Sequence, residues 1–84
     1  ESQALVARLS QDEAARNDFF GPFGTISHVN LTDGLRLTFD NGDIVHLRPS
    51  GNAPEMRVYS EAKTEALAQA VIAKAIGRIR QAST

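Results

Sequence analysis

The segment best suited to binding chemistry begins at Arg48 and reads Arg-Pro-Ser-Gly-Asn-Ala-Pro. Arg48 carries a planar fork of donors that fits two phosphate oxygens at once. Ser50 and Asn52 add a hydroxyl and an amide donor, and Gly51 frees the backbone to turn consecutive amides toward one anion. Arg57, in the next predicted strand, adds positive charge at the rim. Together these residues predict a phosphate-binding site.

A second interpretation of the same segment needs no ligand. Proline, serine, glycine and asparagine are ordinary turn residues, and a loop between two strands needs such a set. Arg48 favours the phosphate interpretation, because an ordinary turn does not require it. Residues 1–43 carry seven acidic and three basic side chains, whereas residues 44–84 carry three acidic and six basic ones. The second half therefore attracts anions, although small domains also show such asymmetry by chance.

Other motifs give weaker indications. His28 and His46 have no cysteine or well-spaced third histidine beside them, so we expect solvated or interface histidines and no metal site. His46, two residues before Arg48, is a candidate neighbour of a bound sugar phosphate. The acidic segment 40–43 lacks the spacing and closing glutamate of a calcium-binding EF-hand, and we interpret it as a hairpin turn.

Helical signals at both ends of the chain flank the segment that positions these residues. In residues 2–20, Ser10 and Glu13 have the spacing of a capping box, which predicts Ser10 as the N-cap of a second helical piece. Gly21-Pro22 ends that piece, because proline cannot continue the helical hydrogen bonds. A closing helix is predicted from about residue 61 to residue 81. Its apolar face is expected at Leu67, Ala68, Val71, Ile72, Ala75, Ile76 and Ile79.

Between the helices the apolar period changes to alternation, which predicts strands near residues 25–31, 35–39, 44–48 and 56–59. The side chains expected to face the core are Val29, Leu31, Leu35, Leu37, Phe39, Val45, Leu47, Met56 and Val58. The opposite face carries Arg36, Thr38, His46 and Tyr59. Asn41-Gly42 predicts a type I′ hairpin, in which both central residues have positive φ. We therefore predict an α+β fold in two layers: a four-stranded, mainly antiparallel sheet packed on the C-terminal helix, with an N-terminal helical segment.

Size and composition exclude several classes of protein. A chain of 84 residues forms one small domain with a thin core and is too small for a complete enzyme of ordinary size. A net charge of -1, one tyrosine and no tryptophan argue against a nucleic-acid partner. The absence of cysteine fits a reducing, cytoplasmic compartment. No apolar run approaches the ~20 residues of a membrane span, so we expect no membrane segment and no signal peptide.

The segment from Arg48 to Tyr59 closely resembles the phosphate-binding loop of the last domain of the α-D-phosphohexomutases, a group that includes phosphomannomutase, phosphoglucomutase and the phosphoglucosamine mutases. The resemblance is strong from Asp33 to Glu61 and includes the Asn41-Gly42 turn. The closing helix fits in type and place, and the N-terminal stretch matches weakly. The resemblance implies the TATA-box-binding-protein-like fold of that domain, with residues 1–24 as a helical interdomain lead-in and residues 25–84 as the phosphate-binding domain.

The same resemblance implies a four-domain parent enzyme that moves a phosphoryl group between C1 and C6 of a hexose phosphate, such as mannose or glucose 1- or 6-phosphate. This domain would close the cleft and hold the phosphate that is not reacting. The phosphate contacts would be Arg48, Ser50, Gly51 and Asn52, with Arg57 as an addition. The phosphoserine and Mg²⁺ of the parent would belong to other domains, so we expect no catalytic residue, metal ligand or cofactor here and no activity of this chain alone.

Two positions depart from the commoner family loop, which has threonine in place of Asn52 and glutamate in place of Ala53. Asparagine still donates to phosphate, so binding is expected to survive. The partners implied are a hexose phosphate and the remaining domains of the parent chain, with no nucleic acid and no membrane. The alternative is a free-standing module that binds an anionic partner, a phosphoprotein or RNA, through the same loop.

Overall fold

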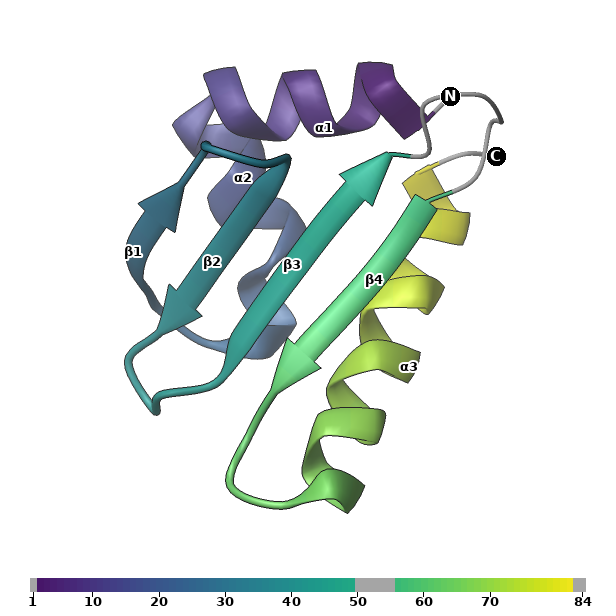
Figure 1. Ribbon diagram of the computed structural model, residues 1–84. Helices are drawn as coiled ribbons and strands as arrows, with labels where there is room; N and C mark the ends of the chain where they lie inside the picture. The colour runs from purple at the N-terminus through teal and green to yellow at the C-terminus, as the bar shows by residue number, and fades with distance from the viewer. Residues whose placement is uncertain (1, 50–55, 83–84) are drawn as a thin grey trace.

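A computed structural model of the chain describes residues 2–49 and 56–82. Its elements are α1 (Ser2–Gln11), α2 (Glu13–Phe19), a 3-10 turn η1 (Gly21–Phe23), β1 (Ile26–Asn30), β2 (Leu35–Phe39), β3 (Ile44–Pro49), β4 (Met56–Glu61) and α3 (Glu65–Ala82). The four strands form one antiparallel sheet in the order β1-β2-β3-β4. The helices lie on one face of this sheet, and α3 runs along β4 (Figure 1). The predicted two-layer α+β fold is confirmed.

The inner face of the sheet is apolar because the strands alternate as their sequences predict. The side chains of Leu35, Leu37, Phe39, Val45 and Leu47 are buried, and Met56 and Val58 pack against them. The intervening residues of β2 and β3 are only half-buried. Since successive side chains of a strand point to opposite faces, burying one set exposes the other. The outer face of the sheet is therefore open.

The helical layer completes the core with residues from both ends of the chain. Val6, Leu9, Phe19, Phe20 and Ala75 are buried in the same cluster as the strand residues. The N-terminal helices, the sheet and α3 therefore share one core.

The last helix is fastened to the end of α2 by one arginine. The Nε of Arg78 donates to the carbonyl oxygen of Phe19 at 3.0 Å, and its guanidinium lies 5.3 Å from the centre of the Phe19 ring. This contact joins residues 59 positions apart in the chain.

The N-cap of α2 is Asp12, and the prediction of Ser10 for this role is wrong. The carboxylate of Asp12 accepts a hydrogen bond from the backbone nitrogen of Ala15 at 3.0 Å, and Asp12 has extended backbone angles. The hydroxyl of Ser10 instead donates to the Val6 carbonyl within α1, at 2.7 Å. Because α1 continues to Gln11, Ser10 is already in helical conformation and cannot begin the next helix.

The hairpin between β2 and β3 also differs from the predicted type I′ turn. The only residues with positive φ in the described part of the chain are glycines, and Gly42 (φ 91°) is the one in this turn. Gly42 donates to the carbonyl of Phe39, and Phe39 donates to the carbonyl of Asp43. The loop therefore has three residues. It is the common three-residue hairpin loop, in which a turn is followed by a glycine in the left-handed region.

At the first strand, two apolar residues do not lie where the alternation of the sequence predicts. The pairing of β1 with β2 shifts between Ile26 and His28. Such a shift adds one residue to a strand and reverses the alternation beyond it. As a result Ile26 packs against the core together with Val29, although the alternation places them on opposite faces. Leu31 follows the end of the strand and is exposed.

The closing helix begins later than predicted, at Glu65. Thr64 caps it: its hydroxyl accepts from the backbone nitrogen of Leu67 at 3.1 Å. Glu61 belongs to β4 instead. Of the predicted apolar face, Val71, Ala75 and Ile79 pack in or against the core, whereas Leu67 in the first turn is exposed.

Gly34 brings the turn before β2 into close contact with β3. Its φ is +75°, a conformation that side chains with a Cβ atom rarely adopt. A Cβ atom here would overlap the carbonyl oxygen of Leu47 and lie 3.3 Å from the Cα of Arg48. Only glycine therefore lets this turn lie against the end of β3.

The first prediction concerns Gly34. We expect Gly34→Ala to lower the free energy of unfolding by about 2–4 kcal/mol, because strain at positive φ adds to a clash with backbone atoms. Gly42→Ala is the matched control, since it has the same strain but open space around it; its expected cost is about 1 kcal/mol. Urea unfolding followed by circular dichroism measures both. Equal losses in the two variants would show that the close contact at Gly34 does not contribute.

A second prediction tests the helix cap. We expect Asp12→Ala to destabilise the protein by about 0.5–2 kcal/mol, the usual cost of removing an N-cap side chain. Ser10→Ala is expected to change the free energy of unfolding by less than about 0.5 kcal/mol, because Ser10 lies inside a helix, where alanine is favoured. The same urea titration compares them. A larger loss for Ser10→Ala than for Asp12→Ala would contradict the assignment.

Candidate functional site

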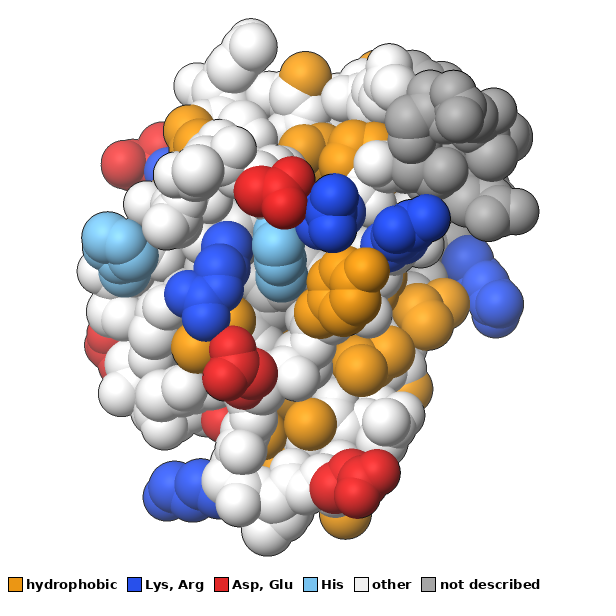
Figure 2. All heavy atoms as spheres, in the orientation of Figure 1, with side chains coloured by type: hydrophobic (Ala, Val, Ile, Leu, Met, Phe, Trp, Pro, Cys, Tyr) orange, Lys and Arg blue, Asp and Glu red, His pale blue; other side chains and the backbone are white. Residues whose placement is uncertain are grey.

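The open face of the sheet carries polar and charged side chains in rows across the strands. In the register of β2, β3 and β4, Arg36 lies opposite His46, and His46 lies opposite Tyr59. Figure 2 shows this face, with basic, acidic and histidine side chains gathered over the strands. The prediction that Arg36, His46 and Tyr59 share the face opposite the helices is confirmed.

On the open face, the row nearest the connection between β3 and β4 consists of two arginines. Arg48 and Arg57 are directly opposite each other in the pairing of β3 with β4. Directly opposed residues have Cα atoms about 4.5–5.5 Å apart in antiparallel sheets, and like charges in such a pair are destabilising. Arg48 is half-exposed and Arg57 is exposed. The sheet thus places two arginines directly opposite each other at one end of adjacent strands.

A carboxylate accompanies this arginine pair. The Oδ2 atom of Asp33 lies 3.2 Å from the Nε atom of Arg48. The Nε2 atom of His46 contacts the backbone carbonyl oxygen of Asp33, and Gly34 packs on the backbone of Leu47 and Arg48. The turn that contains Asp33 is therefore fixed to β3 beside Arg48. The two arginines and the aspartate leave one positive charge in excess, which favours an anion.

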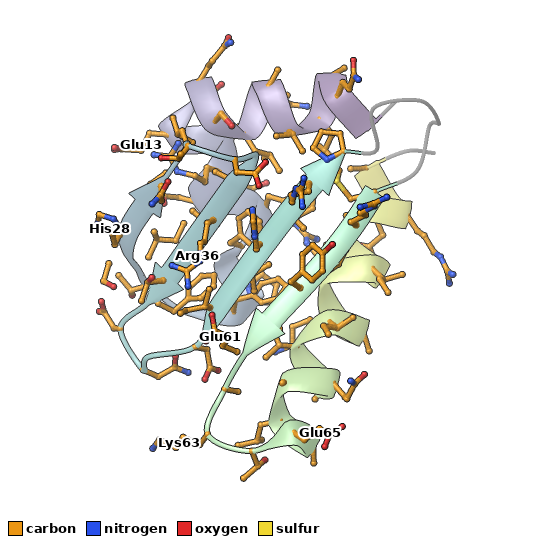
Figure 3. The ribbon with its side chains drawn as sticks, in the orientation of Figure 1. Glu13, His28, Arg36, Glu61, Lys63 and Glu65 are labelled. Carbon is orange, nitrogen blue, oxygen red and sulfur yellow. The ribbon has the colours of Figure 1, made fainter. Side chains whose placement is uncertain are left out.

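A second ion pair lies further along the same face. The Nη2 atom of Arg36 and the Oε2 atom of Glu61 are 3.0 Å apart, and Figure 3 shows these two side chains directed toward each other across the sheet. Because Glu61 belongs to β4, this pair joins β2 to β4 over the intervening β3. The rings of His46 and Tyr59 lie beside it, with centres 5.7 Å apart. Arg36 is thus balanced by a carboxylate of its own, whereas Asp33 accompanies two opposed arginines, Arg48 and Arg57.

Of the predicted phosphate-binding residues, the structure brings Arg48 and Arg57 together. Ser50, Gly51 and Asn52 lie outside the described residues. Sequence reasoning missed the contact of Asp33 with Arg48. The Asp-Gly pair at positions 33 and 34 was the available signal, but it predicts only a turn, and the turn's contact with β3 depends on the folded sheet.

No metal site or membrane segment emerges from the described part of the chain. Within residues 2–49 and 56–82, no three side chains of the metal-binding types His, Asp and Glu lie together. His28 is exposed on the edge strand β1 and lines an open hollow of about 720 Å³ between that strand and α2, away from Arg48. None of the described helices is both long and apolar enough to cross a membrane.

Comparison with known proteins identifies relatives of the whole domain. A family model described as phosphoglucomutase/phosphomannomutase, C-terminal domain, matches residues 1–77. A phosphomannomutase of Sinorhizobium fredii is 44% identical over 75 residues, which cover 89% of this chain and 16% of the relative. A phosphomannomutase of Salmonella muenchen is 47% identical over 55 residues, 66% of this chain and 12% of the relative.

A match over a shorter stretch carries a different name. A probable phosphoglucosamine mutase of Methanothermobacter thermautotrophicus is 44% identical over 43 residues, which cover 51% of this chain and 10% of the relative. The chain therefore spans only a small part of the length of these relatives. The family match extends over the N-terminal helices, the sheet and most of α3. The chain belongs to the family of phosphoglucomutase/phosphomannomutase C-terminal domains.

Proposed function

We propose that this domain holds the non-reacting phosphate of a hexose phosphate and helps to close the active-site cleft of a phosphomannomutase/phosphoglucomutase-type enzyme. The observation that carries the proposal is the pair Arg48 and Arg57, opposed in the register of β3 and β4. A bound phosphate would relieve the repulsion between the two guanidinium groups. The proposal adds Ser50, Gly51 and Asn52 as further donors, because the loop sequence between the strands offers them.

The chemistry of the site is recognition of a dianion on a rigid support. A guanidinium group donates two parallel hydrogen bonds to phosphate oxygens, and such charge-assisted bonds contribute about 1.5–3 kcal/mol each. Two or three of them must offset at least ~4 kcal/mol of lost translational and rotational freedom. We therefore expect dissociation constants near or above about 1 mM for this domain alone.

We propose that the parent enzyme uses this affinity to orient its substrate. The reaction would be transfer of a phosphoryl group between C1 and C6 of a mannose or glucose phosphate. The binding energy of a remote phosphate supports closure of the cleft and orientation of the substrate. Both of these place the reacting groups for phosphoryl transfer. The names of the relatives and the family match support this assignment. The phosphoserine and Mg²⁺ of such an enzyme are expected in its other domains.

A third prediction tests the phosphate site. In an NMR titration of the domain with glucose 1-phosphate, we expect Arg48→Gln to weaken binding about tenfold or more, because a charged hydrogen-bonding partner is lost. Arg36→Gln is the matched control, because it removes the same charge from the same face of the sheet. The exposed ion pair that it breaks contributes only ~0–1 kcal/mol to stability. Its dissociation constant is expected to stay within about twofold of the wild-type value.

The same titration defines the role of Arg57 and the limits of the proposal. Arg57→Gln is expected to weaken binding less than Arg48→Gln does. If the amide signals of residues 50–52 remain unchanged up to tens of millimolar sugar phosphate, or if Arg48→Gln and Arg36→Gln behave alike, the phosphate site is wrong. Strong retention of RNA at physiological salt would instead favour a module for anionic macromolecules.

A further inference from the structure

We propose that Asp33 is a counter-anion built into the phosphate site, which neutralises Arg48 when the site is empty and thereby lowers its affinity for phosphate. This inference rests on the proposed function, since it concerns the same site. It assigns a role to a residue outside the loop that carries the predicted donors. Asp33 acts through Arg48 and is a positioning residue, not a catalytic one.

The first step is that the position of Asp33 is fixed independently of the arginine side chain. Its backbone carbonyl oxygen contacts the Nε2 atom of His46. The following residue, Gly34, lies so close to the backbone of Leu47 and Arg48 that no Cβ atom would fit. These backbone contacts hold the carboxylate beside Arg48, so it remains there when the arginine engages another anion.

The second step concerns which edge of the guanidinium group the carboxylate occupies. Asp33 is paired with the Nε atom of Arg48 at 3.2 Å. The guanidinium group is planar and carries five N–H donors, so the edge formed by its two terminal nitrogens is still suited to phosphate. Phosphate and Asp33 can therefore share one guanidinium group. In that complex the bound dianion lies close to a second negative charge, which opposes its binding.

The third step is the charge balance of the empty site. Arg48 and Arg57 face each other across β3 and β4, and Asp33 offsets part of their repulsion. When phosphate binds, it takes over this function. The binding free energy between phosphate and the arginines is therefore less favourable than it would be without the carboxylate. Removing the charge of Asp33 takes away the carboxylate that the described residues place beside Arg48, and it raises the attraction of the two arginines for a dianion.

Asp33 also orients the side chain of Arg48, and this effect on its own would favour phosphate binding. The side chains of Arg48 and Asp33 are 40% and 62% exposed. Exposed ion pairs of this kind contribute little to holding a side chain in place. A nearby negative charge, in contrast, acts on a dianion over a longer range. The electrostatic effect therefore outweighs the orienting effect, and the substitution Asp33→Asn separates them, because it keeps an acceptor oxygen for Arg48 while removing the charge.

The experiment is an NMR titration of the domain with inorganic phosphate at low and at high ionic strength. We expect Asp33→Asn to bind phosphate about three- to tenfold more tightly than the wild type at low salt, with a smaller gain at high salt because salt screens exposed charges. Asp40→Asn is the matched control. It makes the same change in net charge at the hairpin between β2 and β3, at the other end of these strands, and is expected to change affinity less than twofold.

A measurement on the wild type avoids any effect of substitution on folding. Saturation with phosphate is expected to shift the carboxyl carbon signal of Asp33 together with the Nε signal of Arg48, because the ion pair is shared with the new ligand. Three outcomes would each overturn the role of Asp33 and leave the phosphate site standing. They are an Asp33 signal that does not move, weaker phosphate binding by Asp33→Asn than by the wild type, and equal effects of Asp33→Asn and Asp40→Asn. Absence of phosphate binding in every variant would overturn the phosphate site and, with it, this inference.

Discussion

Burial of Val45 and Leu47 beneath the helices is the constraint on which the open face of the sheet depends. Both side chains are fully buried, so a shift of β3 by one residue would expose them and turn Arg48 toward the core. The hydrophobic effect therefore fixes the side of the sheet on which Arg48 lies. Pairing with β4 then places Arg57 opposite it. The electrostatic repulsion within this pair is small beside the free energy gained by burying the apolar strand residues.

The elements of the fold were predictable from the sequence where one period dominates, as in β2 and β3 with their strict alternation. The errors occurred where two local signals compete or where no local signal marks the change. Ser10 and Asp12 are both good capping residues, and only the length of α1 decides between them. The extra residue in β1 reverses its alternation without any proline or glycine to mark it. Such choices depend on packing with distant residues, which local patterns do not contain.

For the candidate site, sequence reasoning selected Arg48 and Arg57 but could not predict the contact of Arg48 with Asp33. Fifteen positions separate Arg48 from Asp33 in the chain, and their contact requires both the hairpin register and the close packing of Gly34. An aspartate before a glycine is typical of turns throughout proteins, so its type gives no sign of such a contact. The family match supplies the context that single residues lack, because it extends over residues 1–77.

The bond from Arg78 to the carbonyl of Phe19 has a consequence for how the domain folds during synthesis. Phe19 leaves the ribosome well before Arg78, because the bond between them spans 59 positions of the chain. Until that helix emerges, Phe19 and its neighbours lack part of the apolar surface that covers them. Long-range contacts of this kind delay folding and leave apolar groups accessible to chaperones in the meantime. Completion of the core is therefore one of the last events in the synthesis of this domain.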